Sequence, residues 1–137
     1  MSAGVWALAG AACGVAIFMA SAARGAGSGD PKTGEAIYTR CAACHALGYD
    51  RTGPRHCGLF GRRAGSVEGF DYSQAMQRSR IVWNEATLDR FLDDPLRVIP
   101  GTSMGYAGIK DARERADLIA YLKQEGASQR CSSLGPR

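Results

Sequence analysis

The residues best suited to chemistry form one short segment, Cys41-Ala42-Ala43-Cys44-His45. Two thiols three residues apart lie on the same side of a helical turn, where they can add to the two vinyl groups of one haem. The histidine that follows can carry an imidazole to the iron. Cys-x-x-Cys-His is a c-type haem attachment signal, so the segment predicts one covalently bound haem c.

The segment has three other interpretations. A thioredoxin-like dithiol calls for a βαβ setting, and half of a zinc site calls for a second Cys/His pair. The sequence offers neither setting. Chance spacing in an alanine-rich helix is the remaining alternative, and the context described below argues against it.

The second axial ligand decides whether the haem carries electrons or binds small molecules. The candidates are four methionines and one histidine, namely Met1, Met19, Met76, Met104 and His56. Met1 and Met19 fall in the N-terminal apolar segment, Met76 is interpreted as core filler, and His56 is interpreted, like the acidic residues, as surface. Met104 lies in a Gly-flanked loop, and its soft thioether favours ferrous iron. We therefore predict His45 and Met104 as the two axial ligands.

The chain divides into four parts by composition. Residues 1–22 are apolar and uncharged and end in small residues, which predicts a cleaved signal peptide. Because no basic residue precedes the apolar run, an uncleaved membrane anchor is the alternative. Residues 23–29 are expected to form a flexible lead, residues 30–125 one haem domain, and residues 126–137 a polar C-terminal tail.

The cysteines outside the haem motif suggest a crosslink. Cys13 leaves with the signal segment, so Cys57 and Cys131 remain as an even pair in a chain expected to reach an oxidising compartment. A Cys57–Cys131 disulfide would hold the polar tail, which has little else to fix it. Two free thiols are the alternative.

The net charge limits the kind of partner, and capping and apolar patterns predict the helices. The net charge of +4 includes only three lysines, so it favours solubility and acidic protein partners and gives no sign of nucleic-acid binding. Capping and apolar patterns predict helices at about residues 30–40, 73–78, 84–94 and 110–125, with Gly126 stopping the last one. Glycine-rich loops at 45–66 and 100–106 lie between them. No sheet is expected, and the predicted fold is all-α with about four to five helices wrapped around one haem.

Taken together, these motifs resemble those of the class I cytochromes c, the mitochondrial-type and photosynthetic-bacterial soluble proteins. The resemblance covers residues 30–123 and includes, besides the haem motif, the segments Thr52-Gly-Pro54, Gly58-Leu-Phe-Gly-Arg62, Gly69-Phe-Asp-Tyr72, Ile81-Val-Trp83, Pro100-Gly-Thr-Ser-Met104 and Glu114-Arg-Ala-Asp-Leu-Ile-Ala-Tyr-Leu122. It implies that the terminal helices cross near Gly34/Tyr38 and Leu118/Tyr121. It also implies that the Pro54 carbonyl accepts a hydrogen bond from His45, and that Tyr72, Trp83 and Arg62 serve a buried haem propionate.

Three departures from the family pattern are visible. Phe91 stands where the family usually has a tyrosine bonded to the methionine sulfur, and Met76 stands where an asparagine is common. Leu96 and Ser103 replace lysines near the haem edge. The basic docking ring is thus thinned, with arginines as possible substitutes at positions 51, 55 and 97.

The expected function is a periplasmic one-electron carrier, not an enzyme. The resemblance implies a quinol-oxidising membrane complex as electron donor and an oxidase, photosynthetic reaction centre or periplasmic oxidoreductase as the other partner. The protein is expected to be monomeric and to meet the membrane only if its N-terminus is uncleaved. The alternatives are a haem peroxidase or nitric-oxide-binding protein, if Met104 does not ligate, and a membrane-anchored electron-transfer subunit.

Overall fold

The computed structural model describes residue 1 and residues 28–133. Within this part of the chain six helices form, and the only strand-like pairing is an isolated bridge between Arg63 and Val82. No helix among these residues is long and apolar enough to cross a membrane. The expected signal segment, most of the flexible lead and the last four residues lie outside the described residues.

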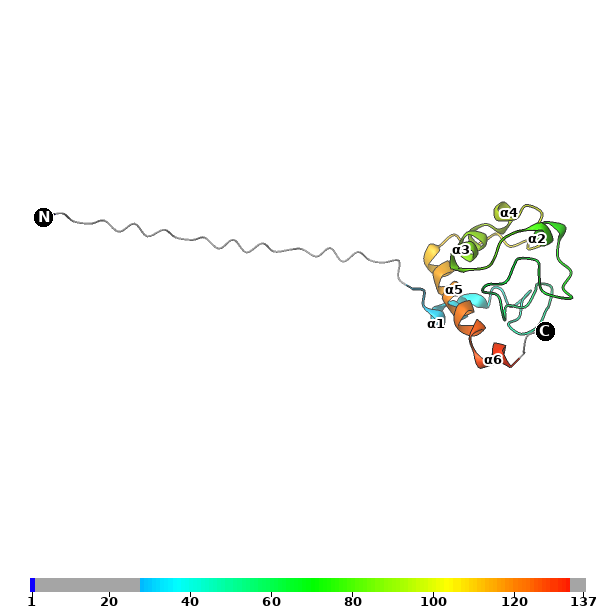
Figure 1. The fold of residues 1–137 in the computed structure, drawn as a ribbon, viewed down its shortest axis with the longest axis horizontal. Helices are drawn as coiled ribbons and strands as arrows, with labels where there is room; N and C mark the ends of the chain where they lie inside the picture. Colours follow the sequence, from blue (N-terminus) through cyan, green and yellow to red (C-terminus); the bar gives the residue numbers. More distant parts are fainter. Residues whose placement is uncertain (2–27, 134–137) are drawn as a thin grey trace.

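The helices appear in the predicted order, with two additions (Figure 1). Their bounds are α1 Pro31–Tyr38, α2 Gln74–Arg78, α3 Glu85–Asp93, α4 Pro95–Val98, α5 Ala112–Gly126 and α6 Gln129–Ser132. The all-α prediction is confirmed. The short α4 and α6 were not expected. Helix α3 ends at Asp93 with Asp94 as its cap, within one residue of the predicted end. Pro95 then stands at the first position of a new turn, where its missing N–H is not needed.

Side-chain caps fix where the long helices begin. The Asp30 carboxylate accepts a hydrogen bond from Lys32 N, and the Asp111 carboxylate accepts from Arg113 N and Glu114 N. Asn84 and Thr87 form a reciprocal capping box at the start of α3. At the other end of α5, Gly126 is the last helical residue and Ala127 is the cap, one residue later than predicted.

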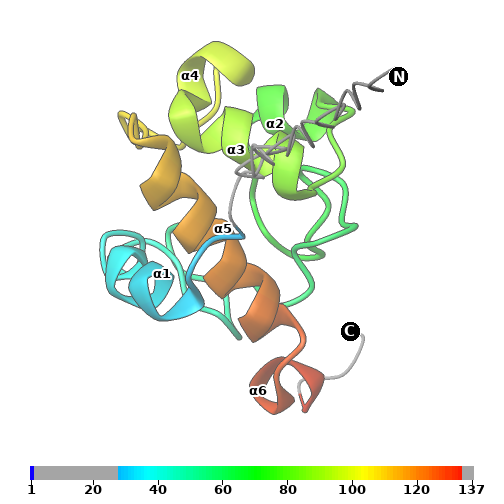
Figure 2. The same cartoon turned by 90° about the vertical axis from the view of Figure 1, so that its left-hand side faces the viewer.

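Helices α1 and α5 cross at close range, as expected (Figure 2). A side chain at Gly34 would overlap the backbone of Asp117 and reach 2.8 Å from Tyr121 Cβ, so only glycine allows this approach. The Tyr38 and Tyr121 rings pack with centroids 5.3 Å apart. Asp117 is buried at the crossing and accepts a hydrogen bond of 2.7 Å from Asp30 N, which corrects the interpretation of all acidic residues as surface.

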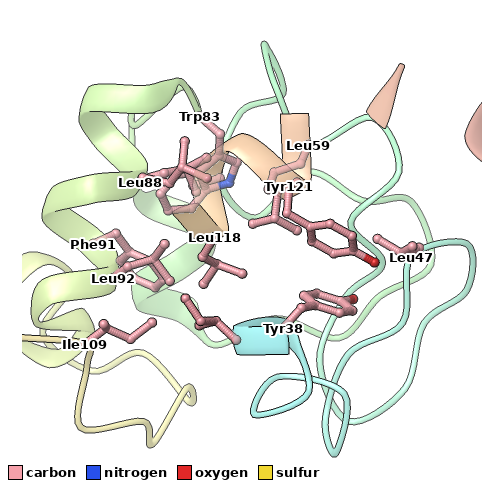
Figure 3. Packing of buried hydrophobic residues seen from close by; sticks show 14 of the residues in the cluster. Tyr38, Leu47, Leu59, Trp83, Leu88, Phe91, Leu92, Ile109, Leu118 and Tyr121 are labelled. Atoms are coloured by element: carbon pink, nitrogen blue, oxygen red, sulfur yellow. The ribbon is translucent and has the colours of Figure 1, made fainter. Parts of the chain in front are cut away.

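Helix α3 packs on the other side of α5 and supplies much of the core. Leu88, Phe91 and Leu92 are buried along one side of α3, as Figure 3 shows beside Leu118 of α5. The apolar stripes of α3 and α5 thus face a shared interior. The loops between the helices close this interior around a cavity.

Candidate functional site

One cavity of about 440 Å³ gathers the residues singled out in the sequence. Its volume lies within the range of ~300–1,000 Å³ found for small-molecule and cofactor sites. It is lined by all eight predicted site residues: Cys41, Cys44, His45, Pro54, Arg62, Tyr72, Trp83 and Met104. The fold therefore brings the haem-attachment segment and the methionine loop to one site, although they lie far apart in the chain.

The two cysteines lie on the turn that follows α1. Cys44 N and His45 N both donate to Cys41 O, at 3.0 and 2.9 Å, so the segment makes a tight helical turn. Neither cysteine is in a disulfide. Burial raises the pKa of the Cys41 thiol. Two thiols presented together on one turn match the attachment chemistry predicted from the motif.

The His45 ring is held by the loop that follows it. Its Nδ1–H donates to Pro54 O at 2.8 Å, as the resemblance implied. Because Nδ1 is engaged, Nε2 is the nitrogen left free to bind a metal. A side chain at Gly53 would overlap the ring, so this glycine allows the close contact. Burial lowers the pKa of His45, which favours the neutral form that ligates iron.

The Met104 side chain reaches the cavity from a loop with fewer restraints. Gly101 turns the chain with a φ of +89°, and Thr102 N donates to Ile99 O at 3.0 Å. Met104 N donates to the Thr102 hydroxyl at 3.3 Å. Thr102 is buried, so it forms the inner support of this loop.

Polar and apolar residues complete the lining. Arg62 donates to the carbonyls of Cys57 and Arg55, at 3.0 and 2.9 Å, and burial lowers its pKa. Burial raises the pKa of the Tyr72 hydroxyl, which keeps it protonated as a donor. Phe91 packs on Trp83 with ring centroids 5.0 Å apart and has no hydroxyl to offer a sulfur atom. Met76, also in the lining, is buried and apolar.

His56 was misjudged from the sequence. It is only partly exposed, and its ring stacks on the His45 ring with centroids 4.4 Å apart and planes 19° apart. Its Nδ1 lies 3.1 Å from the Tyr38 hydroxyl, and burial lowers its pKa to about 3. Only its closeness to His45 in the chain could have hinted at this contact.

Sequence reasoning also missed two further features of the site. Arg40, directly before Cys41, forms a bidentate ion pair with Glu114 of α5, at 2.7 and 2.9 Å. Tyr106 lines the cavity just past Met104. The only sign in the sequence that Arg40 and Tyr106 belong to the site is that each lies close to one of the two motifs.

Two cysteines outside the motif, Cys57 and Cys131, lie within the described residues, one in the loop after His45 and one in α6. The structure joins Cys57 to Cys131 of α6, with Cα atoms 5.2 Å apart. The link ties α6 to the loop that carries Pro54. It spans 74 residues of chain, and it leaves Cys41 and Cys44 as the thiols available to the cavity.

The donors around the cavity fit a haem better than a bare metal ion. No group of three or more His, Cys, Asp or Glu side chains within residues 28–133 is placed to hold an ion by itself. The cavity instead offers two thiols, one imidazole, one thioether and a mainly apolar wall. Thiols for attachment and N and S atoms for the axial positions are the set that a c-type haem requires.

Comparison with known proteins gives consistent matches. The family model "Cytochrome c" matches residues 31–125. Cytochrome c of Gibberella zeae is 48% identical over 99 residues, which cover 69% of this chain and 93% of that protein. Cytochrome c2 of Blastochloris viridis is 42% identical over 112 residues, covering 80% and 88%. The solved structure of cytochrome cH from Methylobacterium extorquens aligns with a TM-score of 0.68 at 38% identity, covering 70% of this chain and 99% of that one.

Proposed function

Because the chain belongs to the cytochrome c family, we propose that its one covalent haem c is attached through Cys41 and Cys44 and ligated axially by His45 and Met104. Members of this family are electron carriers and not enzymes, and this chain is an electron carrier of the class I type. The observation that supports the ligand assignment is the single cavity that collects these four side chains, with His45 oriented by Pro54.

The bound haem supplies the one-electron chemistry, between the ferric and ferrous states. The chain's own residues keep the site constant through that change. Pro54 O holds the His45 ring and increases its basicity as a ligand. The thioether of Met104 is a soft ligand and raises the reduction potential. With His45 and Met104 both retained as ligands, the site would need little reorganisation for electron transfer.

The propionate side is served by protein donors. Tyr72 and Trp83 line the cavity and carry an O–H and an N–H, and Arg62 is a cation of the same lining. We assign them to a buried haem propionate, because a buried carboxylate without donors is costly. The apolar Met76 makes this side drier than the common family pattern.

We place the carrier in the periplasm, with residues 1–22 as its export signal. Its donor is a quinol-oxidising membrane complex, and its other partner is an oxidase, a photosynthetic reaction centre or a periplasmic oxidoreductase. The interfaces formed in such encounters are small, and the complexes are transient. Leu96 and Ser103 are both exposed, and no lysine is among the described residues that line the cavity.

The test of this function is kinetic. The purified holoprotein is mixed with a quinol-oxidising complex and an oxidase, and its reduction and reoxidation are followed at several ionic strengths. We expect rapid one-electron cycling and a weaker salt dependence than in lysine-rich relatives. Turnover of peroxide, or tight binding of nitric oxide to the resting protein, would instead support the enzyme or sensor alternative. N-terminal sequencing of the protein from its native host separates the exported carrier from an anchored subunit.

A further inference from the structure

The face of the His45 ring is covered by a second histidine, which the electron-transfer function does not require. His56 lies nearly parallel to His45, at a centroid separation of 4.4 Å and an interplanar angle of 19°. The two side chains do not hydrogen-bond to each other: the Nδ1 of His45 is paired with Pro54 O, and the Nδ1 of His56 lies beside the Tyr38 hydroxyl. The contact is therefore a packing contact between two flat rings.

His56 is itself held from two directions. Its backbone N–H donates to the carbonyls of Ala46 and Leu47, both at 3.1 Å, which fixes the main chain independently of the side chain. Its ring Nδ1 lies 3.1 Å from the hydroxyl of Tyr38. Tyr38 in turn packs against Tyr121 in the α1–α5 crossing. The ring that covers His45 is thus connected, through Tyr38, to the α1–α5 crossing.

We propose that His56 is a positioning residue for the axial ligand, and that its ring fixes the plane of the His45 imidazole through the stack. This inference rests on the proposed ligation of haem iron by His45. The hydrogen bond from Nδ1 to Pro54 O fixes one point of the His45 ring but leaves rotation about the line through that bond open. A flat surface against the ring face removes this freedom, so the two contacts together define one orientation.

The orientation has consequences for the haem. The direction of the imidazole plane sets the pattern of paramagnetic shifts of the haem methyl groups in the ferric protein. A ring that is free to tilt also weakens its bond to Pro54 and becomes a less basic ligand. A less basic imidazole stabilises ferric iron less, so loosening the ring raises the reduction potential.

The test compares three single variants of the full holoprotein. His56→Leu keeps an apolar side chain but removes the flat ring, His56→Phe keeps a flat ring but loses the nitrogen, and Tyr38→Phe removes only the hydroxyl that orients His56. The readouts are the proton NMR shifts of the haem methyls in the ferric state and the reduction potential. Unfolding curves of each variant measure stability separately.

We expect His56→Leu to change the methyl pattern and raise the potential, while His56→Phe stays close to the wild type. The proposal is overturned if His56→Leu keeps the wild-type pattern and potential, or if His56→Phe changes both as much as His56→Leu does. If His56→Leu yields no holoprotein, Tyr38→Phe decides: a smaller change in the same direction supports the proposal, and wild-type values contradict it.

Failure of the ligation itself is recognisable in the wild type. A high-spin ferric spectrum would show that His45 and Met104 do not both bind the iron, and it would contradict the proposed function together with the role of His56. A low-spin wild-type spectrum combined with unresponsive variants would overturn the role of His56 alone.

Discussion

The two loops that bring His45 and Met104 to the cavity are held very differently. The proximal loop, residues 45–62, is crossed by bonds from Gly53 N to Cys44 O and from Cys57 N to Leu47 O, both 2.7 Å, besides the bond from His45 to Pro54. The link between Cys57 and Cys131 adds a covalent restraint. The distal loop, residues 99–106, has the bond from Thr102 N to Ile99 O and the longer one of 3.3 Å to the Thr102 hydroxyl.

This difference in restraint indicates which of the two ligands is expected to dissociate first. The His45 ring has a hydrogen bond, a stacked neighbour and a glycine contact. Among the described residues, no side-chain hydrogen bond reaches the Met104 sulfur, and Phe91 has no hydroxyl with which to make one. Local opening takes the least restrained part of a fold first. Ligand exchange is therefore expected at Met104 while His45 stays bound.

The largest effect is expected from removing the distal ligand. Met104→Ala should open one face of the iron and lower the reduction potential by more than about 0.1 V, within the ~0.8 V range that axial ligands control. Voltammetry and the ferric absorption spectrum measure both changes. Met76→Leu is the matched control, because Met76 also lines the cavity. If the control and Met104→Ala behave alike, Met104 is not the ligand.

Loss of the crosslink should lower the stability of the loop that holds His45 without affecting the bond between Met104 and the iron. The double variant Cys57→Ser/Cys131→Ser should lower the free energy of unfolding by about 2–4 kcal/mol, since the link closes a long loop. Denaturant unfolding with and without reductant measures this, and reductant should have no effect on the double variant. Two alkylatable thiols in the unreduced wild type would show that the link does not form in solution.

The glycine contact of His45 predicts a somewhat smaller loss. Gly53→Ala places a methyl group against the His45 ring and should cost about 1–3 kcal/mol of stability by overpacking. Thermal unfolding of the holoprotein and its haem content report the effect. Gly126→Ala is the control, because a side chain there meets no other atom and the residue does not line the haem cavity. Equal losses in both variants would mean that the contact at Gly53 is unimportant.

The smallest effect is expected from restoring a hydrogen bond to the Met104 sulfur. Phe91→Tyr adds a hydroxyl in the cavity wall, and one hydrogen bond to the sulfur should strengthen the iron–methionine bond by about 0.5–1.5 kcal/mol. The alkaline midpoint at which Met104 is displaced should rise by up to about one pH unit. A pH titration of the ferric spectrum follows it. An unchanged or lowered midpoint, or an equal rise in Phe91→Leu, would argue against this explanation of distal weakness.

The fold and the ligand motifs could be predicted because they depend on local signals. Caps such as Asp30 and Asn84, and the order of the motifs, are readable along the chain. The α1–α5 crossing was implied by the family resemblance, and the structure places Gly34 and Tyr38 in it. The stack of His56 on His45 could not be predicted, because it depends on how a long glycine-rich loop folds back. The short helices α4 and α6 were missed because one turn leaves almost no periodic pattern.

The most direct test of a restrained proximal and a weaker distal ligand is the absorption spectrum of the ferric holoprotein, from red to near infrared, during titration with imidazole. A weak far-red band typical of a methionine–iron bond should be present at the start. It should disappear on titration while the spectrum stays low-spin, with His45 still bound. A high-spin spectrum without the band before any imidazole is added would contradict the account, because the distal face would then be open.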